Sequence, residues 1–467
     1  MERIFYRPDS GVSADYIPYY ENGVFYLFYL RDYRAPATRG EGTPWFLVTT
    51  TDFVHFTEHG EVLPRGTEAE QDLYVFTGCV TKMGGRYHIH YTGHNPHLRA
   101  RGLPEQAVMH AVSDDLLHWH KCPQDTFFAP EGYERHDWRD PLIWYEPERQ
   151  RYRMLLAARC LAGASRRRGV TAQCHSSDGV HWQTDAPFYA PGAYYTHECP
   201  DLFRIGEWYY LLFSEFSQEH VTRYRISRDP NGPWRAPADD RLDSCAYYAA
   251  KTAASEAGRF LFGWIATREG ETDDGWWQWG GCLAVHQLLQ RPDGTLRAVM
   301  PPSLARRFAA QTSAELTLDG TLALAAQTVG QLPSCCGVTC VFRVPEARGK
   351  ASLALAADEA LAEGYFLTLD MDRRRLLLDR WPRTVENGME PGMERPLPPT
   401  ADGTYRLRVL VDGSAACAYL NDEIAMCFRL YDRAKPYWGV LAENTALTAQ
   451  CGLCAPDSRN GDEACES

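Results

Sequence analysis

The 467-residue chain has no long apolar run, no excess of basic residues and no paired cysteine motif. Without a stretch of about 18 apolar residues, it predicts no membrane-spanning helix. Its first residues show no apolar segment after a basic one, which argues against a secretory signal peptide. With 48 Lys and Arg against 61 Asp and Glu, the net charge of −13 argues against a nucleic-acid partner. We therefore expect a cytoplasmic protein that acts on a neutral ligand.

Several catalytic signatures are also missing. The chain has no glycine-rich phosphate loop, no Gly-x-Ser-x-Gly elbow and no His-Glu-x-x-His pattern, which excludes nucleotide, serine-hydrolase and zinc-protease chemistry. The 15 cysteines are scattered, and Cys451 and Cys454 form the only Cys-x-x-Cys pair. We expect free thiols in a reducing compartment, and neither a metal nor a cofactor.

The composition changes near residue 300. All 15 histidines lie at or before His286, and 11 of the 13 tryptophans lie at or before Trp279. A Pro-Pro breaker at Pro301 precedes a region in which apolar and polar residues alternate, as in 405–412. We predict one domain over residues 1–305 and a β-sandwich over 306–467, with a frayed tail from about Pro456.

An internal repeat organises the first domain. Five similar aromatic strands recur at intervals of 61, 65, 57 and 51 residues, with Tyr26, Tyr87, Tyr152, Tyr209 and Phe260 as markers. Three segments that follow such strands, 51–56, 113–119 and 177–182, resemble turns that lead into an outer strand. Five copies of about 60 strand-forming residues predict a five-bladed β-propeller. An irregular β-sandwich is the alternative.

Three acidic residues precede the markers at similar distances. Asp15, Asp140 and Glu198 lie 11, 12 and 11 residues before Tyr26, Tyr152 and Tyr209. The first strand of each propeller blade lines the central channel. We therefore expect the acids to occupy equivalent positions on three inner strands and to meet at one opening.

Clustered acids cost free energy, because like charges repel and burial disfavours ionisation. A metal, a basic partner or catalysis can offset that cost. A calcium site is possible, but no loop rich in Asp and Asn accompanies the acids. Glycoside cleavage uses such carboxylates as a nucleophile or base and as a proton donor. The many aromatic residues of the first domain offer faces on which sugar rings can stack.

These motifs resemble those of glycoside hydrolase family 32, the invertase, inulinase and levanase group. The segment Trp138–Pro141 is similar to the family's Arg-Asp-Pro motif, and Glu198–Asp201 resembles its Glu-Cys-Pro motif. The resemblance implies an all-β fold, with a five-bladed propeller followed by a β-sandwich. It further implies that the enzyme cleaves β-fructosidic bonds with retention. Asp15 would be the nucleophile, Glu198 the acid/base and Asp140 the stabiliser of the transition state.

The same resemblance suggests which residues bind the substrate. The stretch that begins at Phe76 is similar to a sugar-contacting Phe-Ser-Gly-Ser segment, Trp45 stands where the family has a Trp that lines the site, and His197 replaces a Trp. We expect the contacts to be Arg139, Trp45, Phe76, Thr77, Asp32, His197 and Trp279. For Arg139 a structural ion pair stays open, and for His197 a role as a hydrogen-bonded neighbour.

Two other functions remain open. A propeller glycosidase similar to family 43, a furanosidase or xylosidase, would use two Asp and a Glu but invert the anomeric centre. A carbohydrate-binding propeller with weakened catalysis is the second, because Ala14 stands where family 32 usually has Asn before the nucleophile. The expected partner is a carbohydrate in every case, with no nucleic acid and no membrane. The sequence makes no prediction of the oligomeric state.

Overall fold

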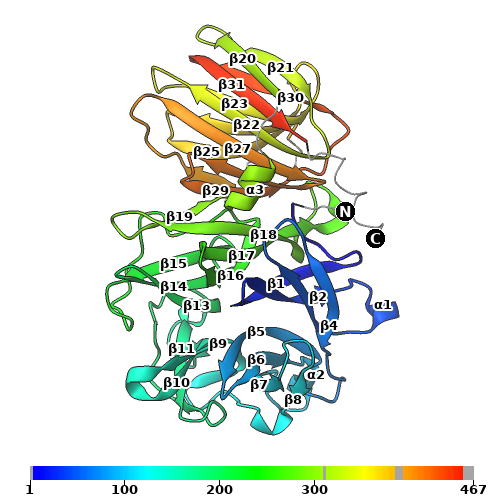
Figure 1. The fold of residues 1–467 in the computed structure, drawn as a ribbon, viewed down its shortest axis with the longest axis vertical. Coiled ribbons are helices and arrows are strands. Elements are labelled where there is room, and N and C mark those ends of the chain that lie inside the picture. Colours follow the sequence, from blue (N-terminus) through cyan, green and yellow to red (C-terminus); the bar gives the residue numbers. More distant parts are fainter. Residues whose placement is uncertain (1–3, 309–311, 384–392, 456–467) are drawn as a thin grey trace. The chain divides into compact units, whose positions relative to one another are not determined.

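The structure is a computed structural model that describes residues 4–308, 312–383 and 393–455 (Figure 1). The frayed tail predicted from Pro456 lies outside these residues. The described residues are mostly β-strand, as the sequence predicts. They form two compact units, one of 6–266 with 279–297, and the other of 1–5, 267–278 and 298–467. Neither unit is a continuous piece of the chain.

The larger unit contains four antiparallel sheets. One has the order β16 (Tyr247–Ser255), β17 (Gly258–Arg268), β18 (Trp277–Gln290), β1 (Val12–Glu21), β2 (Val24–Asp32), β3 (Trp45–Thr50) and β4 (Thr57–Leu63), and β19 (Leu296–Val299) pairs with β18. The second is β5 (Tyr74–Met83), β6 (Arg86–His94), β7 (Gln106–Ser113) and β8 (His120–Lys121). The third is β9 (Tyr133–Glu146), β10 (Arg151–Cys160), β11 (Gly169–Ser176) and β12 (Gln183–Thr184). The fourth is β13 (Glu198–Ile205), β14 (Trp208–Glu215) and β15 (Val221–Ser227).

Short helices connect these strands. They are α1 (Pro36–Arg39), α2 (His97–Ala100), α3 (Pro302–Arg307) and the 3₁₀ turns η1 (Pro123–Asp125), η2 (Pro147–Arg149), η3 (Ser165–Arg167) and η4 (Glu269–Glu271). No helix in the described ranges has the length and apolar character needed to cross a bilayer.

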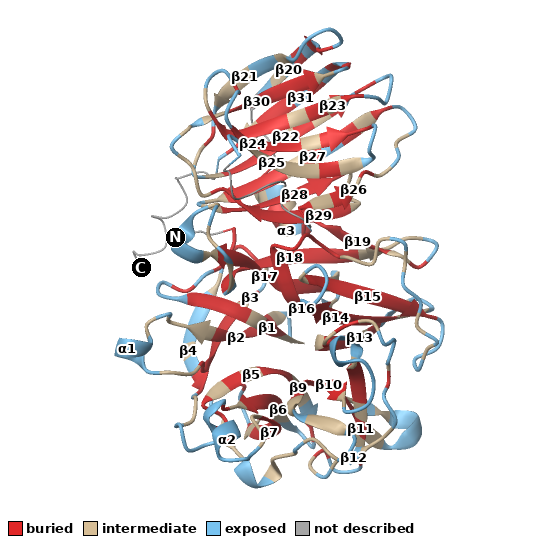
Figure 2. Cartoon of the chain, turned by 180° about the vertical axis from the view of Figure 1, so that it is seen from behind, coloured by how far each residue is buried: buried red, intermediate tan, exposed pale blue. Residues whose placement is uncertain are grey.

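Each repeated aromatic segment is the strand that follows the first strand of its repeat. These segments fall on β2, β6, β10, β14 and β17, and each pairs with the strand before it, β1, β5, β9, β13 or β16. The middle of each of these strands is an unbroken run of buried residues, and Figure 2 shows buried segments running through the sheets. Apolar clusters between neighbouring sheets hold the strands in place, because burying such side chains removes apolar surface from water.

Each of the five leading strands contains a β-bulge at the same place. The pairing shifts by one residue after Ala14, Phe76, Arg139, Glu198 and Tyr248. A bulge leaves a residue outside the ladder of hydrogen bonds and turns its side chain in a new direction. Four of the five bulges place the next residue in the left-handed region, with φ of 46° at Asp15, 59° at Asp140, 49° at Cys199 and 51° at Ala249.

Three of the sheets contain the same turn just before their outer strands β4, β8 and β12, which confirms the turns predicted there. In the first, Asp52 Oδ1 accepts hydrogen bonds from the amides of Val54 (2.9 Å) and His55 (2.8 Å). Its Oδ2 lies 2.7 Å from His55 Nδ1. Asp115 and Asp178 repeat these bonds in the second and third sheets. The side chains replace backbone partners that the turn leaves unsatisfied.

The smaller unit consists mainly of two six-stranded antiparallel sheets. One is β20 (Thr312–Asp319), β31 (Ala446–Cys454), β22 (Cys335–Arg343), β27 (Thr404–Asp412), β28 (Ala415–Leu420) and β29 (Ile424–Arg429). The other is β21 (Ala325–Gln331), β30 (Tyr437–Glu443), β23 (Lys350–Ala357), β24 (Gly364–Asp370), β25 (Arg375–Trp381) and β26 (Glu394–Pro396). The alternating segment 405–412 is β27, so the strand prediction for this region is confirmed.

Candidate active site

Asp15 sits on the bulge of β1, partly open to solvent. Its Oδ2 accepts a hydrogen bond of 2.7 Å from Thr77 Oγ1, and its Oδ1 accepts one of 2.9 Å from Trp264 Nε1. The donors come from β5 and β17, so strands far apart in the sequence fix both oxygens. Such a carboxylate is held in one orientation before a substrate arrives.

Asp140 occupies the matching position on β9 and is buried. Its Oδ2 accepts a 2.9 Å hydrogen bond from the amide of Cys199, and its own amide donates to Thr92 Oγ1 at 2.8 Å. The left-handed backbone and these two bonds direct the carboxylate toward β13, where Glu198 begins the strand.

Glu198 is partly exposed, with 22% of its side chain accessible. Arg139 Nη2 donates to its Oε1 at 3.0 Å, and the Tyr248 hydroxyl donates to its Oε2 at 2.6 Å. The expectation that the three acids occupy equivalent positions is wrong for this residue. Glu198 precedes the bulge of β13, in register with Arg139, whereas Asp15 and Asp140 lie on their bulges. Sequence offsets cannot resolve this difference of one residue.

Cys199 links the acids through short contacts. Its amide binds Asp140, and its Sγ lies 3.9 Å from Thr77 Oγ1, the same hydroxyl that donates to Asp15. Because Cys199 directly follows Glu198, a single chain of contacts connects all three acids. The structure therefore brings together the three carboxylates that the sequence singled out.

Burial raises the pKa of Asp15 to about 7. The negative charges of Asp140 and Glu198 add to this rise, and the hydrogen bonds from Thr77 and Trp264 oppose it. Burial also raises the pKa of Asp140 to about 6, where the positive charge of Arg139 opposes the rise and the charge of Glu198 adds to it. The acids thus lie near enough to affect one another's ionisation.

Arg139 and Thr77 lie at the centre of this network. Arg139 is buried and also bonds Asp137 Oδ1 (2.8 Å) and Thr196 Oγ1 (3.1 Å), so its guanidinium is fixed on several sides. A positive charge held in this way offsets part of the repulsion among the acids. Thr77 is fully buried and reaches Asp15 only through its hydroxyl.

The other residues expected to contact the substrate differ in their surroundings. Trp45 is fully buried in an apolar core and donates from Nε1 to the carbonyl of Phe76 (3.2 Å), so its ring offers no face to a sugar. Phe76 is partly exposed and stacks on His94, with the ring centres 4.8 Å apart. Asp32 is partly exposed and accepts a hydrogen bond from the amide of Arg34 at 2.7 Å.

His197 and Trp279 have opposite environments. His197 is fully buried, stacks on Phe213 and lies 3.1 Å from Thr171 Oγ1 through Nδ1. Burial lowers its pKa to about 3, so the ring is neutral and cannot exchange protons near pH 7. Trp279 is 37% exposed and packs edge-on against Trp264, the donor to Asp15, which leaves a face of its ring open to solvent.

Four functional neighbours went unrecognised in the sequence. Trp264 and Tyr248 bind the acids from the fifth repeat, which carries no acid of its own. Thr92 holds the amide of Asp140, and Lys251 donates to the carbonyl of Pro200 at 3.1 Å while its charge lowers the pKa of Asp140. The Tyr-Tyr-Ala-Ala-Lys segment at 247–251, aligned with the motifs of the other repeats, was the available signal.

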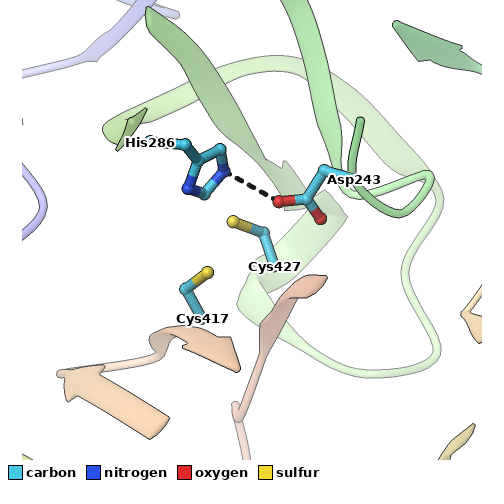
Figure 3. Close-up of side chains that lie close together, drawn as sticks. All are labelled: Asp243, His286, Cys417 and Cys427. Carbon is cyan, nitrogen blue, oxygen red and sulfur yellow. Dashed lines mark ion pairs between the residues drawn. The ribbon is translucent and has the colours of Figure 1, made fainter. Parts of the chain in front are cut away.

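Other clusters of ionisable side chains lie away from this network. The larger unit holds a fully buried ion pair, in which His286 Nε2 lies 2.9 Å from Asp243 Oδ2 (Figure 3). Two groups on its outer strands and loops have the composition of metal ligands, His110 with Cys122 and Asp125, and Glu41 with Glu68 and His97. The hydrogen bonds that surround Asp15, Asp140 and Glu198 involve none of these residues.

Comparisons with known proteins identify the family. A family model, the N-terminal domain of glycosyl hydrolases family 32, matches residues 13–299. The sucrose-6-phosphate hydrolase of Vibrio alginolyticus is 26% identical over 307 residues, which span 61% of this chain and 60% of that enzyme. The raffinose invertase of Escherichia coli is 24% identical over 448 residues, 89% of this chain and 86% of that one.

Solved structures share the fold across nearly the whole chain. Sucrose-6-phosphate hydrolase from Lactobacillus gasseri superposes with a TM-score of 0.78 at 17% identity, covering 98% of this chain and 93% of that one. Fructan 1-exohydrolase IIa from Cichorium intybus gives a TM-score of 0.74 at 18% identity, covering 97% of each chain. Since the family model spans more than half of the sequence and contains all three acids, the chain belongs to glycosyl hydrolases family 32, a family of glycosidases.

Proposed function

We propose that this protein is a retaining β-fructosidase that acts on sucrose, fructo-oligosaccharides or fructans. The observation that carries the proposal is the chain of contacts from Asp15 through Thr77 and Cys199 to Asp140 and Glu198. Names of its relatives, sucrose-6-phosphate hydrolase, raffinose invertase and fructan 1-exohydrolase, support the substrate class.

The reaction takes place in two displacements. Asp15 attacks the anomeric carbon while Glu198 protonates the leaving oxygen, which gives a fructosyl ester on Asp15 and a free alcohol. Glu198 then removes a proton from water, which attacks the same carbon and releases Asp15. Asp140 accepts hydrogen bonds from ring hydroxyls, and these bonds strengthen as positive charge develops on the sugar.

Other residues keep the groups in position. Thr77 and Trp264 hold both oxygens of Asp15, and Arg139 and Tyr248 hold those of Glu198. Groups fixed before the substrate binds need little reorganisation during the reaction. Trp279 offers an exposed ring beside Trp264 on which a sugar can stack.

The fold proposed for this function is a five-bladed propeller followed by a β-sandwich. Five bulged leading strands support five blades, with two of them, β1 and β16, within the eight-stranded sheet. The two six-stranded antiparallel sheets of the smaller unit support the sandwich.

The decisive experiment measures fructose release from sucrose, inulin and levan, and reads the anomer of the first product by NMR. We expect β-fructose first, and a loss of kcat of at least about 10³-fold in Asp15→Asn and Glu198→Gln. Asp185→Asn is the matched control, because Asp185 pairs with His175 on the outer strands (3.0 Å). An inverted product would favour the family-43-like chemistry. If the unmutated protein releases no fructose but still binds sugar, a carbohydrate-binding propeller would be favoured.

A further inference from the structure

The smaller unit contains a groove of about 780 Å³ on one face of the sheet that includes β23, β24, β25 and β30. All of its lining residues belong to this unit, so the groove is separate from the three acids. Along β24, Phe366 and Thr368 face the groove, while Leu367 between them and Leu369 after them are completely buried. The sheet therefore has one apolar face and one face with a hollow.

The floor and the rim of the groove differ in chemistry. Leu361, Phe366 and Leu441 form part of a buried apolar cluster and line the floor. At the rim stands Trp381, 49% exposed, beside Arg383, whose guanidinium lies 5.0 Å from the centre of the indole ring. An exposed indole over an apolar floor suits the flat apolar face of a sugar ring.

Polar side chains of the groove are ordered in pairs. Lys350 Nζ lies 3.1 Å from both carboxylate oxygens of Glu443. The guanidinium of Arg383 donates from Nε to Oδ1 of Asp379 at 3.0 Å. Such pairs present fixed donors and acceptors to a ligand with many hydroxyl groups. Ser352 and Thr368 add two hydroxyls, 2.8 Å apart, in the middle of the sheet.

The charges of the groove cancel. Three acids stand against three bases, namely Asp370, Asp379 and Glu443 against Lys350, Arg373 and Arg383. A phosphorylated or acidic ligand would need a surplus of bases, and a basic peptide a surplus of acids. A neutral, hydroxyl-rich chain needs neither, and a volume of this size lies within the range of small-molecule sites.

We propose that this groove is a second carbohydrate-binding site, which takes a segment of a neutral oligosaccharide or polysaccharide away from the catalytic acids. Trp381 stacks on one sugar ring, and Asp379, Arg383 and Lys350 hydrogen-bond to hydroxyls.

The test is native electrophoresis of the full chain in gels that contain inulin, levan, arabinan or xylan, on the Asp15→Asn background to prevent turnover. At least one polysaccharide should slow the migration of the Asp15→Asn protein in the gel. Trp381→Ala and Asp379→Ala should each weaken that affinity about tenfold, whereas Trp381→Phe keeps a stacking ring and should stay within about threefold. Tyr145→Ala is the control, an exposed aromatic residue of the larger unit. Added salt should change the retardation little, because the groove is neutral.

Measurements of sucrose cleavage distinguish the groove from the catalytic site. In the active background, kcat/KM on sucrose should be the same for the parent and Trp381→Ala. If the protein cleaves no fructoside but Trp381-dependent retardation is seen, the proposed function fails and this inference stands. Identical mobility of the parent and both alanine variants in every gel would overturn it, provided that circular dichroism shows both variants folded. A change in sedimentation coefficient caused by Trp381→Ala would instead identify the face as a contact between copies of the chain.

Discussion

Asp15 meets two opposed demands. It must be ionised to attack the substrate, yet burial raises its pKa to about 7. The protonated fraction of the free enzyme therefore increases as the pH falls below 7. We expect kcat/KM on sucrose to decrease about tenfold per pH unit below about 6, and to level off above about 8 on this limb. A profile that stays flat down to pH 5 would mean that the pKa of Asp15 in the free enzyme lies well below 7.

The same carboxylate should lower the free energy of unfolding at high pH. The pKa of Asp15 is higher in the folded protein than in the unfolded chain, so the folded state binds more protons between about pH 4 and 7. The free energy of unfolding therefore falls as the pH rises through this window. Asp15→Asn removes that loss and keeps groups that can bond to Thr77 and Trp264.

Thermal denaturation at pH 4.5 and pH 8 checks this prediction. We expect Asp15→Asn to raise the free energy of unfolding at pH 8 by on the order of 2 kcal/mol more than at pH 4.5. Asp185→Asn, a change on the outer strands, serves as the control. A gain that does not grow with pH would mean that Asp15 is less perturbed than its surroundings indicate.

Tyr248 tests how Glu198 is held. Its hydroxyl donates to Glu198 Oε2 at 2.6 Å, whereas the neighbouring Tyr247 donates to the carbonyl of Ala284 at 3.4 Å. Losing a hydrogen bond to a charged group costs about 1.5–3 kcal/mol, so Tyr248→Phe should lower kcat/KM by about 10–100-fold. It should also shift the alkaline limb of the pH profile, and Tyr247→Phe should do neither. Equal effects of the two variants would point to packing alone.

At the level of residues, the sequence predicted the acids better than their surroundings. Asp15, Asp140, Glu198 and Arg139 stand in short motifs, and the structure brings them together. Trp45 also stands in a recognisable place, but the motif could not show that its ring is fully buried. The indole that does reach an acid comes from β17, and only the three-dimensional arrangement of the strands reveals it.

At the level of elements, the repeat predicted which segments become strands but not their bulges. A strand pattern has a period of two, and one extra residue reverses the faces that follow it. The left-handed residues that create the bulges include two Asp, a Cys and an Ala, with no glycine to mark them. For this reason Glu198 seemed equivalent to Asp15 when it lies one residue earlier in the pattern.

The repeated turns allow a direct test at the same scale. Asp115 accepts hydrogen bonds from the amides of Leu117 (2.9 Å) and His118 (2.8 Å), whereas the adjacent Asp114 forms only an exposed pair with Arg86. Asp115→Asn should destabilise the protein by about 1 kcal/mol and lower Tm by about 1–3 °C. Asp114→Asn should leave Tm unchanged, because exposed ion pairs contribute little. Similar melting curves for the two variants would show that the turn does not depend on its carboxylate.

For the whole molecule, composition predicted a change near residue 305 but not the interleaving of the units. Residues 267–278 belong to the smaller unit, where the amide of Arg268 donates to the Tyr431 hydroxyl at 2.7 Å. At the start of the chain, the amide of Ile4 donates to Asp412 at 2.9 Å. Local alternation of residues cannot reveal partners that are more than 150 positions apart.

A cut at the predicted boundary should therefore fail. A fragment of residues 1–305 keeps three segments of the smaller unit, 1–5, 267–278 and 298–305, without the rest of that unit, which exposes surface that is otherwise paired. We expect this fragment to aggregate or to lack a cooperative melting transition, while the full chain melts cooperatively. Circular dichroism and sedimentation of both proteins would decide, and a soluble fragment with a sharp transition would contradict the expectation.

The five bulges also bear on how such an enzyme can change its substrate. Each one releases a residue from the regular ladder at positions 15, 77, 140, 199 and 249, while the bonds on either side still fix the sheet. The side chains at 15, 77 and 140 serve the proposed reaction and must stay. A new side chain at position 199 or 249 would instead alter what the centre can recognise without disturbing the pairing of the strands, so evolution, or a designer, can try new specificities at these two positions one at a time.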